Sequence, residues 1–465
     1  MPDFNQAFIN GTIAPVRGTQ TQTVEGPFSA TPPVIVTHGD AADVDRAVHS
    51  ACAALGDWSQ SGLATRSTVL EALATAISDR QVDIAAAITA DVGTPEKISQ
   101  IVQAGLPVSV LRGFAQDAEA ALAPETIAHS TVHHRPIGVI AAITPWNYPL
   151  HQAMAKVGAA LAAGCTLVLK PSELTPRTNL IMMEILAATT PAGVINVVCG
   201  DRTTGAALVE HADVDAVSFT GSVAGGQSVA LAAAKHLKPC FLELGGKSAG
   251  IVLDDADLDL ALKAIVNGGL LNTGQTCNAL TRILVPAAML DVAADKVAAL
   301  ADKMTTRLGP VVSQAQFDAV QGFIARAEKT DGVTLVTGGL GHPDGLTDGY
   351  YVKPTVFKVT DRGAEVASTE VFGPVLSVIG YGSDDDLVAL ANGTDYGLAA
   401  ALWGEDTERI DALSARLRAG QIDINGAPFN PRAPFGGFAR SGSGREMGFH
   451  GIREFQRPVS IQRKG

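Results

Sequence analysis

A single cysteine in a loop of small polar residues is the strongest chemical signal in this chain. Cys277 closes the segment LNTGQTC of residues 271–277. A thiol attacks a carbonyl carbon only as the thiolate, and its ordinary pKa is about 8.5, so it needs nearby N–H groups, a cation or a base. Glu243, in the segment ELGGK of residues 243–247, is the obvious base. The pair predicts nucleophilic catalysis, whereas a loop cysteine taken alone is just as often an inert small hydrophobe.

Two polar segments follow predicted strands, where doubly wound sheets bind their ligands. The segment TPWNYP of residues 144–149 contains Asn147, whose amide can donate a hydrogen bond to an oxyanion. In the segment KPSE, Lys170 and Glu173 can both reach ribose hydroxyls, although a surface ion pair would have the same sequence. These segments predict a ligand site at one edge of a sheet.

Two glycine-containing segments fit a dinucleotide, each weakly when taken alone. The segment FTGSVAGG of residues 219–226 leads from a strand into a helix, whose free N–H groups and dipole can receive a pyrophosphate. It is not GxGxxG, and any strand-to-helix turn could look similar. The segment EVFGPV of residues 370–375 sets a carboxylate and an aromatic ring before a strand, and by itself it reads as a turn.

Composition narrows the class of protein. The chain has 465 residues, 46% of them hydrophobic and 17% charged, which predicts a compact α/β protein of two or three domains. A formal charge of −13 disfavours nucleic acid or an anionic membrane as a partner. Five cysteines without a CxxC pair, no signal peptide and no apolar run of about 20 residues predict a soluble, cytoplasmic enzyme. His133 and His134 are adjacent and do not share a helical face, so we predict no metal.

Short apolar runs alternate with helical patterns from about residue 137, which is typical of a doubly wound, Rossmann-type sheet. Strands are predicted in the first half at 137–143, 166–169, 194–198 and 216–219. A second α/β domain is predicted to begin near residue 246, with strands at 281–285, 375–379 and 399–403. The polar, alternating stretches 125–135 and 452–462 are expected to be strands that reach a neighbouring subunit, or ordinary edge strands.

In this order and over essentially the whole chain, these segments resemble the aldehyde dehydrogenase superfamily, in its non-acylating, NAD(P)-dependent form. The resemblance implies a Rossmann-type cofactor domain, an α/β catalytic domain and a small β oligomerisation element in a homodimer or homotetramer. The implied ranges are 1–117 and 137–245 for the NAD-binding domain, 246–447 for the catalytic domain, and 118–136 and 448–465 for the oligomerisation strands.

The resemblance also implies the chemistry. Cys277 attacks the aldehyde carbon, and the Asn147 amide and the Cys277 N–H hold the oxyanion of the thiohemiacetal. Hydride leaves for the nicotinamide, and Glu243 activates the water that hydrolyses the resulting thioester. Lys156 and Glu446 match positions of a proton relay to this base, although a buried structural ion pair would explain them equally well.

The matching cofactor positions favour NAD over NADP. Glu370 is expected at the nicotinamide ribose, and Phe372 near the nicotinamide ring. Glu173 accepts hydrogen bonds from free ribose hydroxyls but repels a 2′-phosphate. The full set of expected cofactor residues is Thr144, Pro145, Trp146, Lys170, Ser172, Glu173, Gly205, Phe219, Thr220, Gly221, Ser222, Leu244, Gly245, Glu370 and Phe372.

The positions that flank the family's aldehyde tunnel suggest an aromatic or medium-chain aldehyde or a semialdehyde. Ala155 stands where relatives carry bulkier residues, which predicts a wide tunnel, and His151 and Gln152 could read a heteroatom. Arg432 is either a partner for a substrate carboxylate or a surface residue. The expected substrate residues are Tyr148, His151, Gln152, Ala155, Thr276, Asn278 and Phe429.

Two alternatives stay open at this point. A coenzyme A-acylating semialdehyde dehydrogenase would not need a water-activating base such as Glu243. A binding protein of the same fold without turnover would not need both Glu243 and Cys277. Leu271 and Ala439 depart from the commoner phenylalanine and lysine of the family, and neither touches the expected chemistry.

Overall fold

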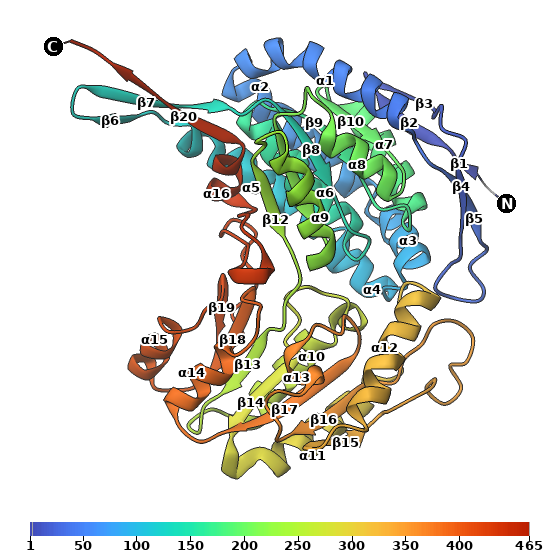
Figure 1. The fold of residues 1–465 in the computed structure, drawn as a ribbon, viewed down its shortest axis with the longest axis vertical. Coiled ribbons are helices and arrows are strands. Elements are labelled where there is room, and N and C mark those ends of the chain that lie inside the picture. The colour runs from blue at the N-terminus through green and yellow to red at the C-terminus, as the bar shows by residue number, and fades with distance from the viewer. Residues whose placement is uncertain (2, 465) are drawn as a thin grey trace.

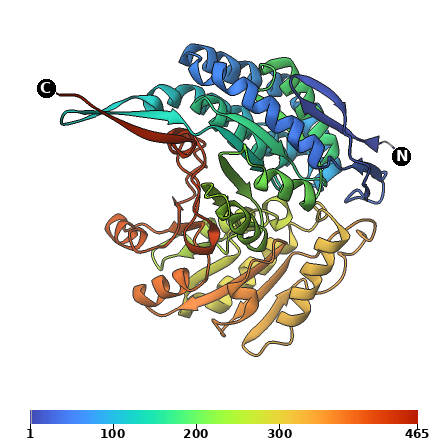
Figure 2. The same cartoon turned by 45° about the horizontal axis from the view of Figure 1, so that its top comes forward.

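The chain folds around two seven-stranded sheets, one above the other in Figure 1. The structure is a computed structural model that describes residue 1 and residues 3–464. The strand order is β12-β11-β8-β9-β10-β2-β3 in the first sheet and β15-β16-β17-β14-β13-β18-β19 in the second. Figure 2 shows the same two sheets after a turn of the molecule. The predicted α/β class is therefore confirmed.

The first sheet has five parallel strands and an antiparallel hairpin at one edge. The parallel strands are β8 (Val139–Ile143), β9 (Thr166–Lys170), β10 (Ile195–Val198), β11 (Ala216–Thr220) and β12 (Cys240–Glu243). Every residue of β8 and β9 is buried, because helices cover both faces. The hairpin β2 (Gln6–Ile9) and β3 (Thr12–Pro15) joins next to β10. Four of these strands were predicted, whereas β12 and the hairpin were not.

Helices cover the two faces of the first sheet separately, as in a doubly wound fold. One face carries α2 (Leu63–Asp79), α3 (Gln81–Val92), α5 (Leu106–Leu122), α6 (Pro149–Ala163) and α7 (Pro176–Thr189). The other carries α1 (Ala41–Gln60), α8 (Arg202–Glu210) and α9 (Val223–Ala234). Between α3 and α5 the chain forms the short helix α4 (Glu96–Ile98) and a π-helical turn, Ser99–Gln103.

The second sheet is parallel except for one edge strand. Its parallel strands are β13 (Ala249–Val252), β14 (Arg282–Pro286), β16 (Thr355–Val359), β17 (Val375–Tyr381), β18 (Ala399–Trp403) and β19 (Gln421–Ile424), with β15 (Val333–Thr337) antiparallel to β16. Helices α10 (Leu258–Gly269) and α11 (Leu290–Asp302) cover one face. The other face holds α12 (Gln314–Ala327), α13 (Glu365–Ser368), α14 (Asp384–Asn392) and α15 (Thr407–Ser414).

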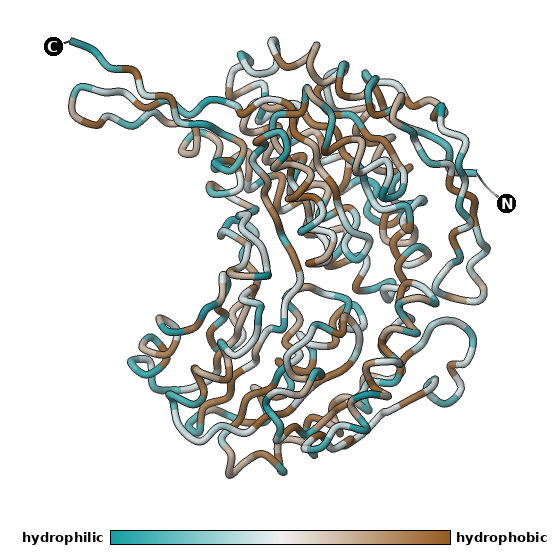
Figure 3. The backbone as a smooth tube through the Cα atoms, in the orientation of Figure 1, coloured by the Kyte–Doolittle hydropathy of each residue, from teal (hydrophilic) through white to brown (hydrophobic). Residues whose placement is uncertain are grey.

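Two three-stranded sheets complete the molecule. One is formed by β1 (Asp3–Phe4), β5 (Val34–Thr37) and β4 (Thr21–Val24). The other pairs β20 (Gln456–Gln462), β7 (Ser130–Pro136) and β6 (Glu125–Ile127), and it projects from the body as an arm that ends near the C-terminus (Figure 1). Figure 3 shows apolar segments gathered in the two large sheets and mixed polarity along the arm.

The predicted C-terminal strand begins later than expected. Residues 452–454 belong to α16 (Gly448–Glu454), because Ile452 and the following Phe455 are buried in the core under α5. Helix α5 itself runs to Leu122. The strands of the arm therefore begin later in the chain than the first residues of the predicted ranges 118–136 and 448–465. In the described part of the chain, no helix is both long and apolar enough to cross a bilayer.

Candidate active site

The segments singled out in the sequence meet at one edge of the first sheet. Strands β8, β9, β11 and β12 are parallel neighbours, so the loops at their carboxyl ends emerge on the same side, facing the second sheet (Figure 1). After β12 the chain crosses to β13 through the ELGGK segment. A Cβ at Gly246 would lie 2.4 Å from the Cys277 carbonyl oxygen, so this crossing packs directly on the cysteine loop.

The cysteine loop is held in a strained conformation. In the turn Leu271–Gly274, Asn272 (φ 51°), Thr273 (φ 59°) and Gly274 (φ 75°) are all left-handed, a conformation that costs about 1–3 kcal/mol for each non-glycine residue. Neighbouring segments fix it: Thr94 Oγ1 donates to Asn272 Oδ1 (2.6 Å), and Thr273 Oγ1 donates to the Gly309 carbonyl (3.0 Å). No motif in the sequence had marked Thr94.

The Asn147 side chain is tied to this loop. Its Nδ2 donates to the Gln275 carbonyl (3.0 Å), and Asn272 Nδ2 donates to the Asn147 carbonyl (3.0 Å). An amide NH2 has two hydrogens, so Asn147 keeps one that this bond does not use. Asn147 is 4% exposed, and its side chain is bonded to Gln275, two residues before Cys277 in the loop.

Cys277 opens onto a pocket of about 560 Å³. The expected substrate residues Tyr148, His151, Gln152, Thr276, Asn278 and Phe429 line it. The sequence did not predict the rest of the lining, which comes from residues 101–109, the start of the cysteine loop and the C-terminal segment: Ile101, Val102, Gly105, Leu106, Ser109, Leu271, Phe435 and Met447. Burial, with the charges of Glu370 and Glu243, raises the pKa of the Cys277 thiol to about 12.

The lining of this pocket, among the residues described, is uncharged at neutral pH. His151 is its one ionisable base, and burial lowers the pKa of this imidazole to about 4. His151 Nδ1 and Gln152 Oε1 are buried and find no hydrogen-bond partner in the described structure. Arg432 does not line the pocket: it is an exposed residue whose Nε donates to Asp117 Oδ2 (3.2 Å). Of the two interpretations of Arg432, the structure supports that of a surface residue.

Glu243 faces a second, enclosed cavity of about 10 Å³. It is 3% exposed, and burial together with the charge of Glu446 raises the pKa of its carboxyl well above the ordinary value. Lys156 Nζ donates to Glu446 Oε1 (2.5 Å) and to Ser218 Oγ (2.9 Å) in the same cavity. Ala155 also lines this cavity and is not among the residues that line the cysteine pocket, although it lies on the same helix as His151 and Gln152; its place in the substrate tunnel stays a prediction.

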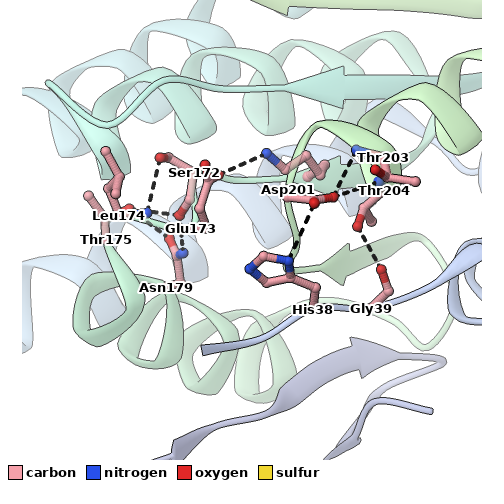
Figure 4. Close-up of polar contacts among 11 residues, drawn as sticks. His38, Gly39, Ser172, Glu173, Leu174, Thr175, Asn179, Asp201, Thr203 and Thr204 are labelled. Carbon is pink, nitrogen blue, oxygen red and sulfur yellow. Dashed lines mark hydrogen bonds and ion pairs between the residues drawn. The ribbon is translucent and has the colours of Figure 1, made fainter. Parts of the chain in front are cut away.

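The loops after β9 and β10 form a polar cluster (Figure 4). Lys170 Nζ lies 3.3 Å from Glu173 Oε2. Asp201 accepts from the N–H groups of Thr203 (2.8 Å) and Thr204 (3.3 Å) at the start of α8, and its Oδ2 lies 3.6 Å from Nδ1 of His38, which is 5% exposed. No sequence motif had pointed to His38 or Asp201.

The remaining cofactor positions form a cradle of small residues and unpaired hydroxyls. Ser222 caps α9 by accepting from the Gly225 N–H (3.1 Å), and a Cβ at Gly221 would lie 2.7 Å from the Phe219 ring. Thr144 Oγ1 and Thr220 Oγ1 are buried without a partner among the described residues. Also at this edge are Pro145, Ser172, Gly205 and Leu244, on the loops after β8, β9 and β12 and on the first turns of α8.

Glu370, on the loop that leads into β17 of the second sheet, completes the cradle. Glu370 Oε1 accepts from the Gly246 N–H (3.0 Å), and a Cβ at Gly245 would meet Glu370 Oε2 at 2.2 Å. Burial raises the pKa of Glu370 to about 7. The Phe372 ring packs edge-on against Trp146, with centroids 5.5 Å apart. Two carboxylates, Glu173 and Glu370, with a helix N-terminus and buried hydroxyls that lack partners, together fit a dinucleotide.

A surface cluster of Asp45, His49 and His211 is the one group with metal-compatible spacing in the described residues. Both ring nitrogens of His211 and Nδ1 of His49 already have partners. His211 Nδ1 accepts from the Asp213 N–H (3.2 Å), which places the ring proton on Nε2, 3.3 Å from Asp45 Oδ1. This hydrogen bonding accounts for the cluster, and the absence of a metal stays a prediction.

Comparison with known proteins agrees with this geometry. The model of the aldehyde dehydrogenase family matches residues 16–461. The 3-succinoylsemialdehyde-pyridine dehydrogenase of a Pseudomonas species is 39% identical over 471 residues, covering 98% of both chains.

Solved structures agree as well. A mutant of aldehyde dehydrogenase C from Pseudomonas syringae, in complex with NAD+ and octanal, has a TM-score of 0.94 at 38% identity and covers 98% of this chain and 96% of its own. The Mycobacterium tuberculosis aldehyde dehydrogenase in complex with NAD+ also has a TM-score of 0.94, at 36% identity, covering 100% and 99%. The chain belongs to the aldehyde dehydrogenase family and is an NAD(P)-dependent oxidoreductase.

Proposed function

We propose that this enzyme oxidises an uncharged aromatic or medium-chain aldehyde to the carboxylic acid, with NAD as acceptor and Cys277 as nucleophile. One observation carries the proposal: the cysteine opens onto an uncharged pocket of about 560 Å³, and the Asn147 amide is hydrogen-bonded to the same loop. A nucleophile and an oxyanion donor are thereby presented to the carbonyl of a bound aldehyde.

The first chemical step is the addition of Cys277 sulfur to the aldehyde carbon. The resting thiol is protonated, because burial raises its pKa to about 12, so it must give up its proton as it attacks. The second N–H of Asn147 and the backbone N–H of Cys277 donate to the oxyanion. Bound NAD would supply the acceptor for the hydride that the carbon expels, and Cys277 would then carry the acyl group as a thioester.

Glu243 is proposed to activate the water that hydrolyses this thioester. Its carboxylate faces the enclosed cavity, beside the loop that carries Cys277, so the side chain must turn toward the thioester to act. A raised pKa suits a general base that works near neutral pH. The presence of this base favours water over coenzyme A as the acyl acceptor.

The cofactor roles follow from the cradle. Glu370 is proposed to hold the nicotinamide ribose, Ser222 and the α9 N-terminus the pyrophosphate, and Lys170 with Glu173 the adenosine ribose. Glu173 lies 3.3 Å from the Lys170 ammonium and Asp201 is close enough to feel its charge, so two carboxylates near Lys170 disfavour a 2′-phosphate and support NAD over NADP.

The uncharged pocket supports a substrate without a free carboxylate, since no lining side chain described here could neutralise one. The names of two relatives are consistent with this choice: one acts on a semialdehyde that carries a pyridine ring, and another was solved with octanal. His151 and Gln152 would meet a heteroatom on the substrate. The projecting arm is proposed to join subunits of a cytoplasmic homodimer or homotetramer.

The test uses the pure protein with NAD and a panel of aldehydes while reduced nicotinamide is followed. We expect the highest kcat/KM for neutral aromatic and medium-chain aldehydes, with the free acid as product both with and without coenzyme A. Turnover confined to carboxylate-bearing semialdehydes, or an acyl-coenzyme A product, would contradict the proposal.

A further inference from the structure

The proposed reaction releases two protons for each aldehyde consumed: RCHO + NAD+ + H2O gives RCOO− + NADH + 2 H+. One proton comes from the Cys277 thiol, and the other from the water that Glu243 activates. Glu243 is only 3% exposed, so a proton that it accepts needs a route to solvent before the next turnover.

Three carboxylates from different elements share the enclosed cavity at Glu243. Glu243 ends β12, Glu446 precedes α16, and Glu454 is the last residue of α16. The volume of about 10 Å³ is close to the minimum that one water needs, and a buried water requires two to four polar partners, which these carboxylates supply.

Four carboxylate oxygens in this cavity lack a hydrogen-bond partner among the described residues. Both oxygens of Glu243, Oε2 of Glu446 and Oε2 of Glu454 have no hydrogen-bond partner in the described structure, while Glu446 Oε1 is held by Lys156. A buried carboxylate oxygen without a partner costs free energy, so protons or a water shared among these groups would stabilise them. Exposure rises outward, from Glu243 at 3% through Glu446 at 8% to Glu454, which is partly exposed although its Oε2 atom is buried.

We infer that Glu454 is the outer member of a proton path that runs from Glu243 past Glu446 to solvent. Each transfer moves one proton between carboxylate oxygens, directly or through the shared water, and leaves the carboxylates unchanged after turnover. Glu454 touches neither aldehyde nor cofactor, so it acts through Glu243. The inference rests on the proposed function, because only hydrolysis loads Glu243 with a proton.

The electrostatics of the outer group suit this role. Burial, with the charge of Glu446, raises the pKa of Glu454 to about 7. The backbone N–H and charge of Arg445 and the charge of Arg457 act in the opposite direction. A carboxyl that titrates near neutral pH can both accept a proton from the interior and release it to the medium.

The experiment compares Glu454→Gln and Glu454→His with the unaltered enzyme, and uses Glu184→Gln as a control, since Glu184 is an exposed glutamate paired with Arg80. The first burst of NADH, formed before hydrolysis, is followed by stopped flow, and proton release by an indicator dye. For Glu454→Gln we expect an unchanged burst and a steady-state rate and proton release about tenfold slower. For Glu454→His we expect recovery of much of the rate, with a pH limb near the ordinary histidine pKa of about 6.5.

Two results would overturn the inference: a Gln variant with the rate and pH profile of the unaltered enzyme, or Gln and His variants that are equally slow with the same profile. If the Gln variant does not fold, the His variant decides alone: a normal burst with proton release near that of the unaltered enzyme supports the path, and a normal burst with slow release contradicts it. Failure of the unaltered enzyme to form NADH from any aldehyde would instead reject the proposed function.

Discussion

The two spaces beside the cysteine loop differ in size, access and charge. The pocket in front of Cys277 is open, about 560 Å³ in volume and uncharged, whereas the cavity at Glu243 is enclosed, about 10 Å³ in volume, and lined by three glutamates, Lys156 and Arg445. An uncharged pocket selects a substrate by shape and desolvation. A small charged cavity cannot admit a substrate, but it can hold and pass protons. The difference teaches that, in the proposed mechanism, aldehyde binding and proton handling occupy separate spaces that meet at Cys277 and Glu243.

The largest expected effect comes from Glu243→Gln, which breaks the link between the two spaces. Hydrolysis loses its base, so the steady-state rate should fall by about 10²–10⁴, while the first burst of NADH persists. In the unaltered enzyme the hydrolytic rate should rise with pH, because the raised pKa of Glu243 keeps part of it protonated at lower pH. Stopped-flow measurement of both phases across pH checks this, and loss of the burst would mean that Glu243 acts before hydride transfer.

Asn147→Ala acts on the cysteine loop beside the front pocket, away from the cavity at Glu243. Removing an oxyanion donor should lower the burst rate by about 10²–10³. The lost hydrogen bond to the Gln275 carbonyl should also lower the thermal midpoint, by an amount equivalent to about 1 kcal/mol. Burst kinetics and thermal unfolding measured on the same sample separate the two effects, and a normal burst would contradict the oxyanion role.

Phe429→Arg places a cation in the front pocket and sharpens the comparison. The preference should move by about tenfold toward aldehydes that carry a carboxylate, since a buried anion then finds a partner. Phe429→Leu is the matched control, because it removes the ring without adding charge. Ratios of kcat/KM for a neutral and a carboxylate-bearing aldehyde of similar length give the readout; equal ratios in both variants would show that charge does not select the substrate.

The smallest effect on kinetics is expected from Ala155→Val, which adds volume to the enclosed cavity. Overpacking should cost about 1–3 kcal/mol of unfolding free energy and leave the aldehyde KM unchanged. Ser109→Val, in the front pocket, should change the aldehyde KM and leave the free energy of unfolding nearly unchanged. Denaturant unfolding and KM for one aldehyde suffice, and a raised KM for Ala155→Val would place Ala155 at the substrate tunnel.

Much of the fold could be predicted because the parallel strands are buried on both faces. Such strands are continuous apolar runs, and β8, β9, β17 and β18 were recognisable for that reason. The strand β12 was missed because it is short and only partly buried, with Glu243 at its end. The tail at 452–454 was misassigned because an alternating pattern does not reveal that Ile452 packs under α5 as part of a helix.

The site was less predictable than the fold. Residues that lie in motifs, such as Cys277, Asn147 and Glu370, could be found from the chain alone. Ile101 and Ser109 could not, because they line the front pocket from a π-helical turn and a helix that carry no chemical signature. Thr94 and Glu454 were missed for a related reason: their roles depend on contacts with segments far away in sequence.

The most direct test of the account is the mass of the Glu243→Gln variant after it is mixed with NAD and a neutral aldehyde, quenched in acid and digested. We predict that the peptide containing Cys277 gains the mass of one acyl group, because the thioester forms and is not hydrolysed. An unmodified Cys277 peptide after a full burst of NADH, or the acyl group on another cysteine, would contradict the central claim.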